Sequence, residues 1–252
     1  LTAILGWLAL DYVKERVLQD VENNLVNALV TTEQRLAVWA EQQANVLSQI
    51  VRNPELIERA ELLLGVEPNP QSLLASDELA AVRATLDEYQ DVLGLGFFII
   101  DKEGVSLASR RDNNVGTENL IVIQSPQILD RVFQGESVFV PPIYSDLENT
   151  GNSITNDSSL FIAVPITNAT GVFAALTMRL DPTQGFSRVL QFSRVGESGE
   201  SYAFDSEGIL ISASRFEDDL RNIGLLGIEQ SSVMNIQIRD PGGDMTEGFL
   251  PD

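Results

Sequence analysis

Two pairs of side chains in this sequence are suited to holding a small molecule. Arg110 and Arg111 end a strand-like run, and Tyr144 and Asp146 follow two prolines. Arginine binds carboxylates through two parallel hydrogen bonds, so the first pair suits an organic anion. An aromatic ring beside a carboxylate suits an ammonium group. In so acidic a chain the arginines could equally form structural ion pairs, and the second pair could be a half-buried tyrosine with an aspartate that caps a turn.

Catalysis has few candidate groups in this chain. Histidine and cysteine are both absent, which removes the commonest general base, the thiol nucleophile and the soft zinc ligands. The only lysines are Lys14 and Lys102. Residues 196–199, Gly-Glu-Ser-Gly, have the spacing of neither a nucleophile elbow nor a phosphate-binding loop, and residues 112–118 lack the alternating acidic ligands of a calcium loop. We expect no catalytic residue, no metal site and no cofactor.

Acidic residues dominate the charge. Asp and Glu number 37 against 16 Lys and Arg, which gives a net charge of −21. This charge repels a polyanion, and no basic face exists to release its counterions, so nucleic acid is excluded as a partner. Flat binding to anionic lipid is disfavoured for the same reason. With 252 residues, 44% of them hydrophobic, the chain is long enough for two domains of about 100 residues each.

A hairpin pattern at residues 97–111, FFIIDKEGVSLASRR, is the centre of the predicted fold. The apolar run at 97–100 is short enough for a buried strand. Residues 101–104 form a polar turn in which Gly104 supplies a positive φ. The residues after the turn alternate as a second strand. The arginine pair ends this second strand, where a pocket would open.

The hairpin pattern returns at residues 201–215, SYAFDSEGILISASR. At an offset of 104 residues, the turn aspartate and glycine become Asp205 and Gly208. Further along, Gly116 is matched with Gly224 after a small insertion. Two copies with matched flanks predict that one α/β module is used twice. The alternative is two unrelated hairpins that share turn chemistry.

Residues 11–51 predict one long helix, because apolar residues recur at helical spacing and neither Pro nor Gly interrupts them. About 40 residues at 1.5 Å each give a length of roughly 60 Å. We expect its apolar seam to pack on the domains that it carries and to pair with a second copy in a homodimer. The seam residues recur at intervals of seven, in two series: Leu18, Leu25, Thr32, Trp39 and Val46, and Leu29, Leu36, Gln43 and Ile50.

Residues 1–10, LTAILGWLAL, are apolar and uncharged. They are too few to span a bilayer, which takes about 20 such residues. We expect them to be the end of a transmembrane helix, with Trp7 and Tyr12 in the interfacial belt. The alternative is the buried start of a soluble helix.

The remaining helices and strands are predicted from the order of segments with helical or strand periodicity. Residues 11–92 hold the long stalk helix and shorter helices at 55–64 and 76–89, and residues 183–200 form a connector. Module one, residues 93–182, has five predicted strands, with a helix at 126–133 between the second and third. This pattern predicts an antiparallel sheet with helices on one side, of the α+β class. Module two, residues 201–252, repeats the hairpin and is expected to be incomplete.

The segments FFIIDKEG, VFVPPIYSD, LFIAVPI, GVFAALTMRLD and GESGESYAFDSEGILISASR follow the long helix in this order. Their order resembles the double Cache (dCache) extracytoplasmic sensor domain of bacterial receptors. The resemblance implies a long N-terminal helix that carries two tandem PAS-like modules, the second truncated here. It also implies a non-catalytic, periplasmic part of an inner-membrane histidine kinase, chemoreceptor or nucleotide cyclase.

The resemblance further implies that module one, which is membrane-distal, holds a small-molecule pocket. The amino-acid-binding members carry an Arg-x-Trp-Tyr-type run and an aspartate on the last strand. Here the corresponding stretch is RRDNNVGTENL, and Leu176 lies near the place of that aspartate. An amino acid is therefore not supported as the ligand, and the pocket could be empty or repurposed. Carried onto this chain, the pocket positions are Arg110, Arg111, Tyr144, Asp146, Phe161 and Thr177.

Three functions compete on this sequence. The first is a receptor sensor domain that binds a small molecule in module one and signals through the long helix, with the polar loop at 147–159 as a lid or a solvated connector. The second is an extracellular scaffold or partner-sensing module without a small ligand. The third, an enzyme, lacks a nucleophile–base or metal constellation.

Overall fold

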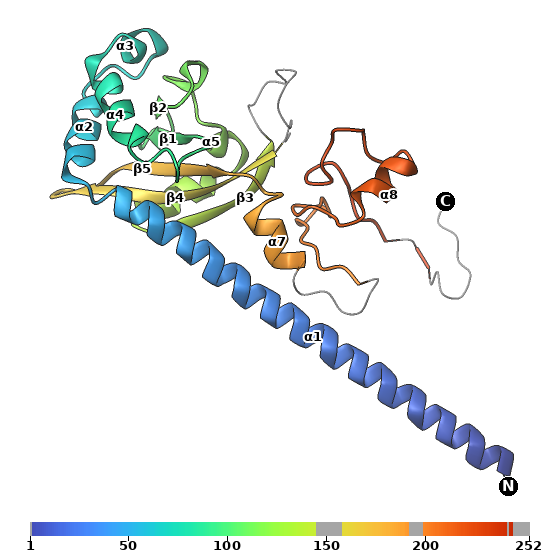
Figure 1. Cartoon of the computed structure of the whole chain (residues 1–252). Helices are drawn as coiled ribbons and strands as arrows, with labels where there is room; N and C mark the ends of the chain where they lie inside the picture. Colours follow the sequence, from blue (N-terminus) through green and yellow to red (C-terminus); the bar gives the residue numbers. More distant parts are fainter. Residues whose placement is uncertain (1, 145–157, 192–198, 241, 244–252) are drawn as a thin grey trace.

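The computed structural model describes residues 2–144, 158–191, 199–240 and 242–243 (Figure 1). A long helix, α1, carries at its C-terminal end a five-stranded sheet with helices around it. A smaller second module, which contains α8, follows α7 (Figure 1). This arrangement confirms the predicted α+β class. Within the described residues, no helix is both long enough and apolar enough to cross a membrane.

The predicted unbroken stalk helix is confirmed. α1 spans Thr2–Ile50. The chain then turns at Asn53, whose side chain caps α2 (Pro54–Leu64) by accepting the Glu55 N–H at 3.0 Å. The proline at the first position of α2 has no N–H to lose, so the Asn-Pro pair both ends one helix and begins the next.

Two short helices precede the sheet. The helix predicted at 76–89 is confirmed as α4 (Asp77–Asp87), and the Ser76 Oγ caps it by accepting the Leu79 N–H at 3.1 Å. α3 (Pro70–Leu74) lies between the two predicted short helices, in a stretch for which no helix is predicted. It forms because Asn69 accepts an N–H of the first turn and a proline follows it, which is the same start signal as in α2.

The five predicted strands of module one are confirmed, and they form one antiparallel sheet. Gly104 has a φ of +87°, the positive value that the hairpin turn requires. The strand order is β2-β1-β5-β4-β3, so the first hairpin forms one edge and β3 forms the other. The strands are β1 (Phe97–Ile100), β2 (Ser106–Ser109), β3 (Val138–Tyr144), β4 (Ser158–Asn168) and β5 (Gly171–Leu180).

Helices cover both faces of this sheet, so the prediction of helices on one side only is wrong. The α1 face, which includes Ile99 and Leu176, packs on α1, α2 and α4. The opposite α6 face, which includes Phe161, packs on α5 (Leu120–Gln124) and α6 (Pro126–Phe133). The prediction failed because α1, α2 and α4 precede the module in sequence and fold back onto its free face. The 3₁₀ turn η1 (Asp112–Asn114) links β2 to α5.

Only the C-terminal part of α1 packs on module one. Leu47 and Ile50 are 0% and 2% exposed and belong to the core on the α1 face. By contrast, Leu25 is 53% and Leu29 is 67% exposed. Val46, which the seam places inside, is 43% exposed. The single seam predicted along the whole helix is therefore wrong at Val46, and the described residues leave its N-terminal half uncovered.

An aromatic cluster joins α1 to the sheet and to α7 (Gly185–Gln191). The ring centroid of Trp39 lies 6.1 Å from those of both Phe139 and Phe186, and the two phenylalanines stack at 5.6 Å. A Cβ on Gly185 would lie 2.8 Å from Trp39 Nε1, so only glycine allows α7 to approach α1 this closely. The helix that links the two modules is thus fixed against both α1 and the sheet.

The two hairpins repeat the same hydrogen bonds. The Asp101 N–H donates to the Val105 carbonyl, and the Asp205 N–H donates to the Ile209 carbonyl, both at 3.0 Å. Each aspartate Oδ1 also accepts the N–H of the residue four positions later, at 2.7 Å and 2.9 Å. Gly208, like its counterpart in module one, has a positive φ, of +79°. The hairpins of the two modules are therefore equivalent in backbone structure.

The repeat continues past the hairpin, but not as predicted. The Gly116 N–H donates to the Ser106 carbonyl at 2.8 Å, and the Met234 N–H donates to the Leu210 carbonyl at 2.7 Å. Both donors have positive φ, +72° and +62°. The residue equivalent to Gly116 is therefore Met234, and the predicted match with Gly224 is wrong. The reason is a longer insertion in module two, which contains α8 (Glu217–Asn222).

Candidate functional site

The α6 face of module one carries a buried polar strip. Thr177 Oγ1 accepts the Phe98 N–H at 3.2 Å across the β1–β5 pair. The rings of Phe98 and Phe161 pack with centroids 5.8 Å apart. Two predicted site residues, Phe161 and Thr177, are thus brought onto one face, and both are 0% exposed. The polar members of the strip, each 4% exposed or less, are Ser109, Ser159, Thr177 and Arg179.

Arg179 is the candidate that sequence reasoning missed. Its guanidinium carbon lies 5.0 Å from the centroid of the Phe161 ring and 5.5 Å from that of Phe98, and Nη1 donates to Ser159 Oγ at 3.0 Å. Burying a charge that cannot be removed by deprotonation is costly unless it is hydrogen-bonded. The available signal was a single charged residue in the otherwise apolar β5, two positions after Thr177 and hence on the same face.

Arg110 and Arg111 lie outside this strip. Arg110 Nη1 donates to the Gly94 carbonyl at 2.6 Å, which ties the end of β2 to the loop before β1. The Arg111 N–H donates to Ser109 Oγ at 3.2 Å, and its side chain is exposed. A neighbouring arginine, Arg83, pairs with Asp112 at 2.8 Å and donates to the Ser109 carbonyl. This edge is therefore a polar surface with structural hydrogen bonds.

Tyr144 lies at the end of β3 with its side chain 55% exposed. The side-chain amide of Gln124 holds its backbone in place, accepting the Tyr144 N–H at 2.9 Å and donating to its carbonyl at 3.0 Å. These two bonds join α5 to the sheet edge. Asp146, and the predicted loop as far as residue 157, lie outside the described residues.

The predicted site residues divide into three groups across the sheet. Phe161 and Thr177 lie in the middle on the α6 face. Arg110 and Arg111 lie at the β2 edge, and Tyr144 lies at the β3 edge. Four strand spacings separate these edges, roughly 19 Å in a flat sheet. The two arginines and Tyr144 lie at the same end of the sheet, so they could border one opening, but the structure does not bring them into contact.

One buried carboxyl lies away from this strip. Asp101 is 3% exposed in the hairpin turn, at the far end of β1 from Arg179. Burial raises the pKa of its carboxyl, and the hydrogen bond from the Val105 N–H partly offsets that effect. Among the described residues, no group of three His, Cys, Asp or Glu side chains is placed to hold a metal ion.

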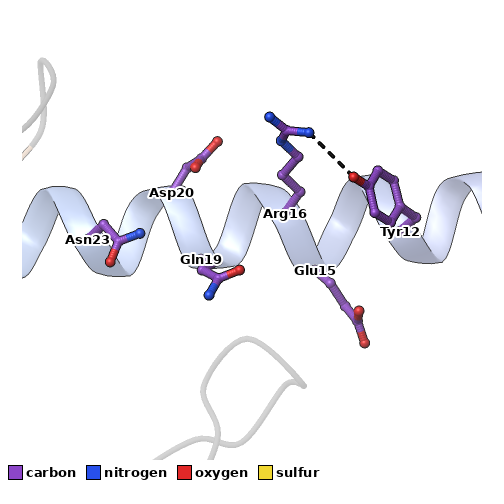
Figure 2. Close-up of a pocket in the computed structure, with 6 residues that line it drawn as sticks. All are labelled: Tyr12, Glu15, Arg16, Gln19, Asp20 and Asn23. Carbon is purple, nitrogen blue, oxygen red and sulfur yellow. Dashed lines mark hydrogen bonds between the residues drawn. The ribbon is translucent and has the colours of Figure 1, made fainter.

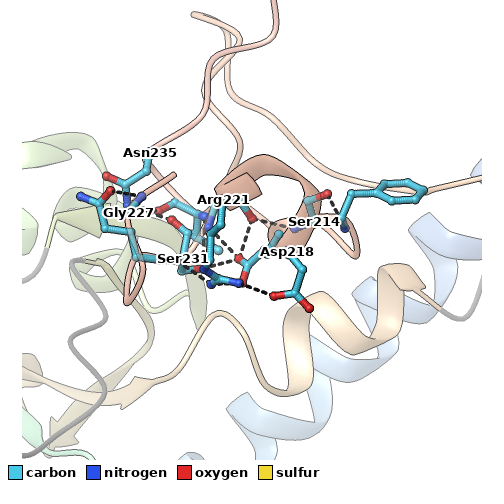
Figure 3. Close-up of polar contacts among 11 residues, drawn as sticks. Ser214, Asp218, Arg221, Gly227, Ser231 and Asn235 are labelled. Atoms are coloured by element: carbon cyan, nitrogen blue, oxygen red, sulfur yellow. Dashed lines mark hydrogen bonds and ion pairs between the residues drawn. The ribbon is translucent and has the colours of Figure 1, made fainter. Parts of the chain in front are cut away.

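Two other polar regions lie outside the strip. A hollow of about 350 Å³ on α1 is lined by residues of that helix alone, with Arg16 bonded to Tyr12 at 3.4 Å (Figure 2). In module two, Glu217 accepts hydrogen bonds from Ser231 and Ser232 and pairs with Arg221 at 3.0 Å (Figure 3). The first hollow has only one wall, and the second network braces α8 against the following loop. The α6 face remains the better candidate site.

Comparison with known proteins gives a match in fold only. No family model and no curated protein matches the chain. Among solved structures, the sensor domain of the histidine kinase DctB from V. cholerae matches with a TM-score of 0.51 at 16% identity, covering 81% of this chain and 75% of that one. The ligand-binding domain of the Pseudomonas aeruginosa PAO1 amino acid chemoreceptor PctC, solved with GABA, gives a TM-score of 0.45 at 12% identity, covering 79% and 78%. The E. coli DcuS sensor domain gives 0.38 at 16%, covering 60% and 95%.

Proposed function

We propose that this chain, which has the fold of a dCache extracytoplasmic sensor domain, is the signal-sensing part of a membrane receptor. It binds a small molecule on the α6 face of module one. The observation that carries the proposal is the buried polar strip around Arg179, on a face whose other residues are apolar. Polar groups in such a place are the usual means of orienting a ligand in an apolar pocket.

The chemistry of the strip favours an organic anion. The buried guanidinium of Arg179 lies over two aromatic rings, and arginine is the side chain best suited to a buried ion pair with a carboxylate. Hydroxyl groups of Ser159 and Thr177 flank it. A carboxylate would accept hydrogen bonds from such groups, and Arg110, Arg111, Tyr144 and Asp146 would border the opening.

The signal would pass through α1 and α7. A ligand on the α6 face contacts the strands β4 and β5, whose opposite face packs on α1. The aromatic cluster of Trp39, Phe139 and Phe186 fixes α7 to the same helix. A small shift of the sheet would therefore move α1 and the link to module two together.

The receptor would hold this chain outside the cytoplasmic membrane. Residues 1–10 would be the end of its membrane helix, and the N-terminal part of α1 would pair with a second copy. Support for the pairing comes from exposed apolar residues on that part of the helix, which include Leu10, Val13 and Val17, each more than half exposed. These same residues also suit a partner protein, which is the observation that favours the scaffold or partner-sensing alternative.

A thermal-shift screen tests the ligand proposal. Acetate, succinate, citrate and benzoate would be compared with their neutral amides. A ligand at 100 times its dissociation constant adds about 2.7 kcal/mol to stability, a clear rise in melting temperature. We expect a carboxylate to give this rise and its amide to give none. If nothing in a wider panel of anions, amines and nucleobases shifts the melting temperature, the partner-sensing alternative is favoured.

Matched variants then locate the site. Arg179→Met removes a buried guanidinium from the α6 face, whereas Arg110→Met removes an exposed one from the β2 edge. We expect the first to abolish the shift and the second to keep it. The reverse result would move the site to the β2 edge, and an unchanged shift in both variants would place the ligand elsewhere.

A further inference from the structure

An apolar groove opens where α1, β3 and α7 meet (Figure 1). Its volume is about 270 Å³, just below the usual range of small-molecule pockets, roughly 300 to 1,000 Å³, so it suits a small ligand. The aromatic cluster of Trp39, Phe139 and Phe186 lines it from all three elements. Phe139 packs on the core of the α1 face, so the groove lies on the opposite side of the sheet from the polar strip of the α6 face.

The α1 wall of the groove carries one charged side chain. Glu33, Leu36, Ala37 and Ala40 recur at i, i+3, i+4 and i+7, which places them on one face of the helix. The short side chains of the two alanines leave the groove open. Glu33 is exposed and forms no ion pair with any described residue. Its carboxylate is therefore available to a charged group from solution.

Cations of this chain lie over other aromatic rings but not over the aromatic cluster. The guanidinium carbon of Arg179 lies 5.0 Å from the centroid of the Phe161 ring, and that of Arg215 lies 4.6 Å from the centroid of the Phe216 ring. Within the described ranges, no arginine or lysine takes such a position over the aromatic cluster. An aromatic ring attracts a cation to its face, and tryptophan does so most strongly. The groove therefore combines rings that attract a cation with a carboxylate that can pair with one.

We propose that this groove binds a small organic cation with an apolar body, of which a quaternary ammonium ion is the best fit. The apolar groups would lie against Leu36 and the aromatic cluster, and the positive charge would face the Trp39 ring and Glu33. A quaternary ammonium ion has no N–H to satisfy, so a groove whose other lining side chains are apolar costs it no hydrogen bond. The net charge of −21 attracts cations to the surface. This inference is independent of the anion proposed for the α6 face.

Tryptophan fluorescence tests the proposal. The chain has two tryptophans, so Trp7→Phe leaves Trp39 as the only one, and its emission reports on the groove. The probe is choline, titrated to about 50 mM, a concentration that detects weak binding, against sodium at the same ionic strength. We expect a saturable change in Trp39 emission with choline and none with sodium. The neutral analogue of choline, in which a carbon atom replaces the nitrogen, should bind at least about tenfold more weakly.

Matched variants then test the two parts of the groove. Glu33→Gln removes the carboxylate beside it, whereas Glu22→Gln removes an exposed carboxylate elsewhere on α1. We expect the first to weaken choline binding about threefold and the second to leave it unchanged. Ala37→Leu fills the groove, and Gln34→Leu adds the same side chain outside it, so only the first should abolish the change in emission. Equal binding of the neutral analogue, equal weakening by the two glutamine variants, or no saturable change with choline would each overturn the proposal.

Discussion

The hairpins of modules one and two have the same hydrogen bonds but different surroundings. Phe98 in module one is 2% exposed, whereas the equivalent Tyr202 is 41% exposed. Asp101 is 3% exposed, whereas the equivalent Asp205 is half-buried. The turn residues alone determine the hairpin, since it forms in both places. What packs around it determines how much each side chain contributes to stability.

Truncation of the two aromatic residues should give the largest difference between the hairpins. Phe98→Ala leaves a cavity in the core on the α6 face, beside the Phe161 ring, and should cost about 3 to 5 kcal/mol of unfolding free energy. Tyr202→Ala removes a side chain from an exposed edge and should cost less than about 1 kcal/mol. Urea unfolding of both variants measures the two values. Similar losses would mean that module two buries its edge as fully as module one does.

The glycine after the first hairpin should give the next largest effect. A Cβ on Gly116 would lie 2.3 Å from the Pro70 nitrogen, and the residue has a φ of +72°. Gly116→Ala therefore combines a backbone clash with left-handed strain, and we expect a loss of about 2 to 4 kcal/mol. Met234→Ala, at the equivalent position, adds no Cβ and is the control. A loss below about 1 kcal/mol for Gly116→Ala would show that α3 can move away from the hairpin.

Local signals explain which parts of the fold were predictable. The helix predicted at 76–89 and the turn at Gly104 are each read from a few neighbouring residues, and both are confirmed. The side of the sheet that the first helices cover was not predictable, because it depends on how the chain folds back after Ile50. The predicted match of Gly116 with Gly224 is wrong because it rests on residue type alone. The equivalent residue, Met234, is identified by the position of its backbone hydrogen bond.

The candidate site was predictable only in part. The alternation of β4 and β5 places Phe161 and Thr177 on one face, as the family resemblance implied. The arginines predicted for the site stand at the end of β2, where exposure is common, whereas the buried Arg179 is the single charged residue of β5. The family resemblance placed Tyr144 and the two arginines around one pocket. The strand order, which separates them, is a long-range property that no short segment encodes.

The two equivalent positive-φ residues allow a comparison with a smaller effect. Met234 is a methionine in the left-handed region, where a residue with a Cβ pays roughly 1 to 2 kcal/mol. Met234→Gly removes this strain. It also loses the contacts of a half-buried side chain and adds conformational freedom to the unfolded chain. We therefore expect the free energy of unfolding to rise by no more than about 1 kcal/mol. Met234→Asn, which tolerates the same φ, should show a smaller change of the same sign. A loss in both variants would mean that the methionine side chain, and not the backbone, holds this turn.

The smallest predicted difference between the hairpins is at the two turn aspartates, and it concerns how protein stability depends on pH. Because burial raises the pKa of Asp101 above its ordinary value of 3.8, the folded state binds the proton more tightly than the unfolded state does. The stabilisation from this group is therefore fully present below pH 3.8 and is lost as the pH rises through the folded-state pKa.

Asp101→Asn keeps the acceptor for the Val105 N–H and removes the charge. We expect the variant to gain stability relative to wild type as the pH rises from about 4 to 7, and the gain to level off above the folded-state pKa. Urea unfolding across this range measures the gain, with Asp205→Asn as the matched substitution in a half-buried turn. A constant difference between wild type and Asp101→Asn over the whole range would show that the turn admits water, and that the two hairpins share their solvation as well as their hydrogen bonds.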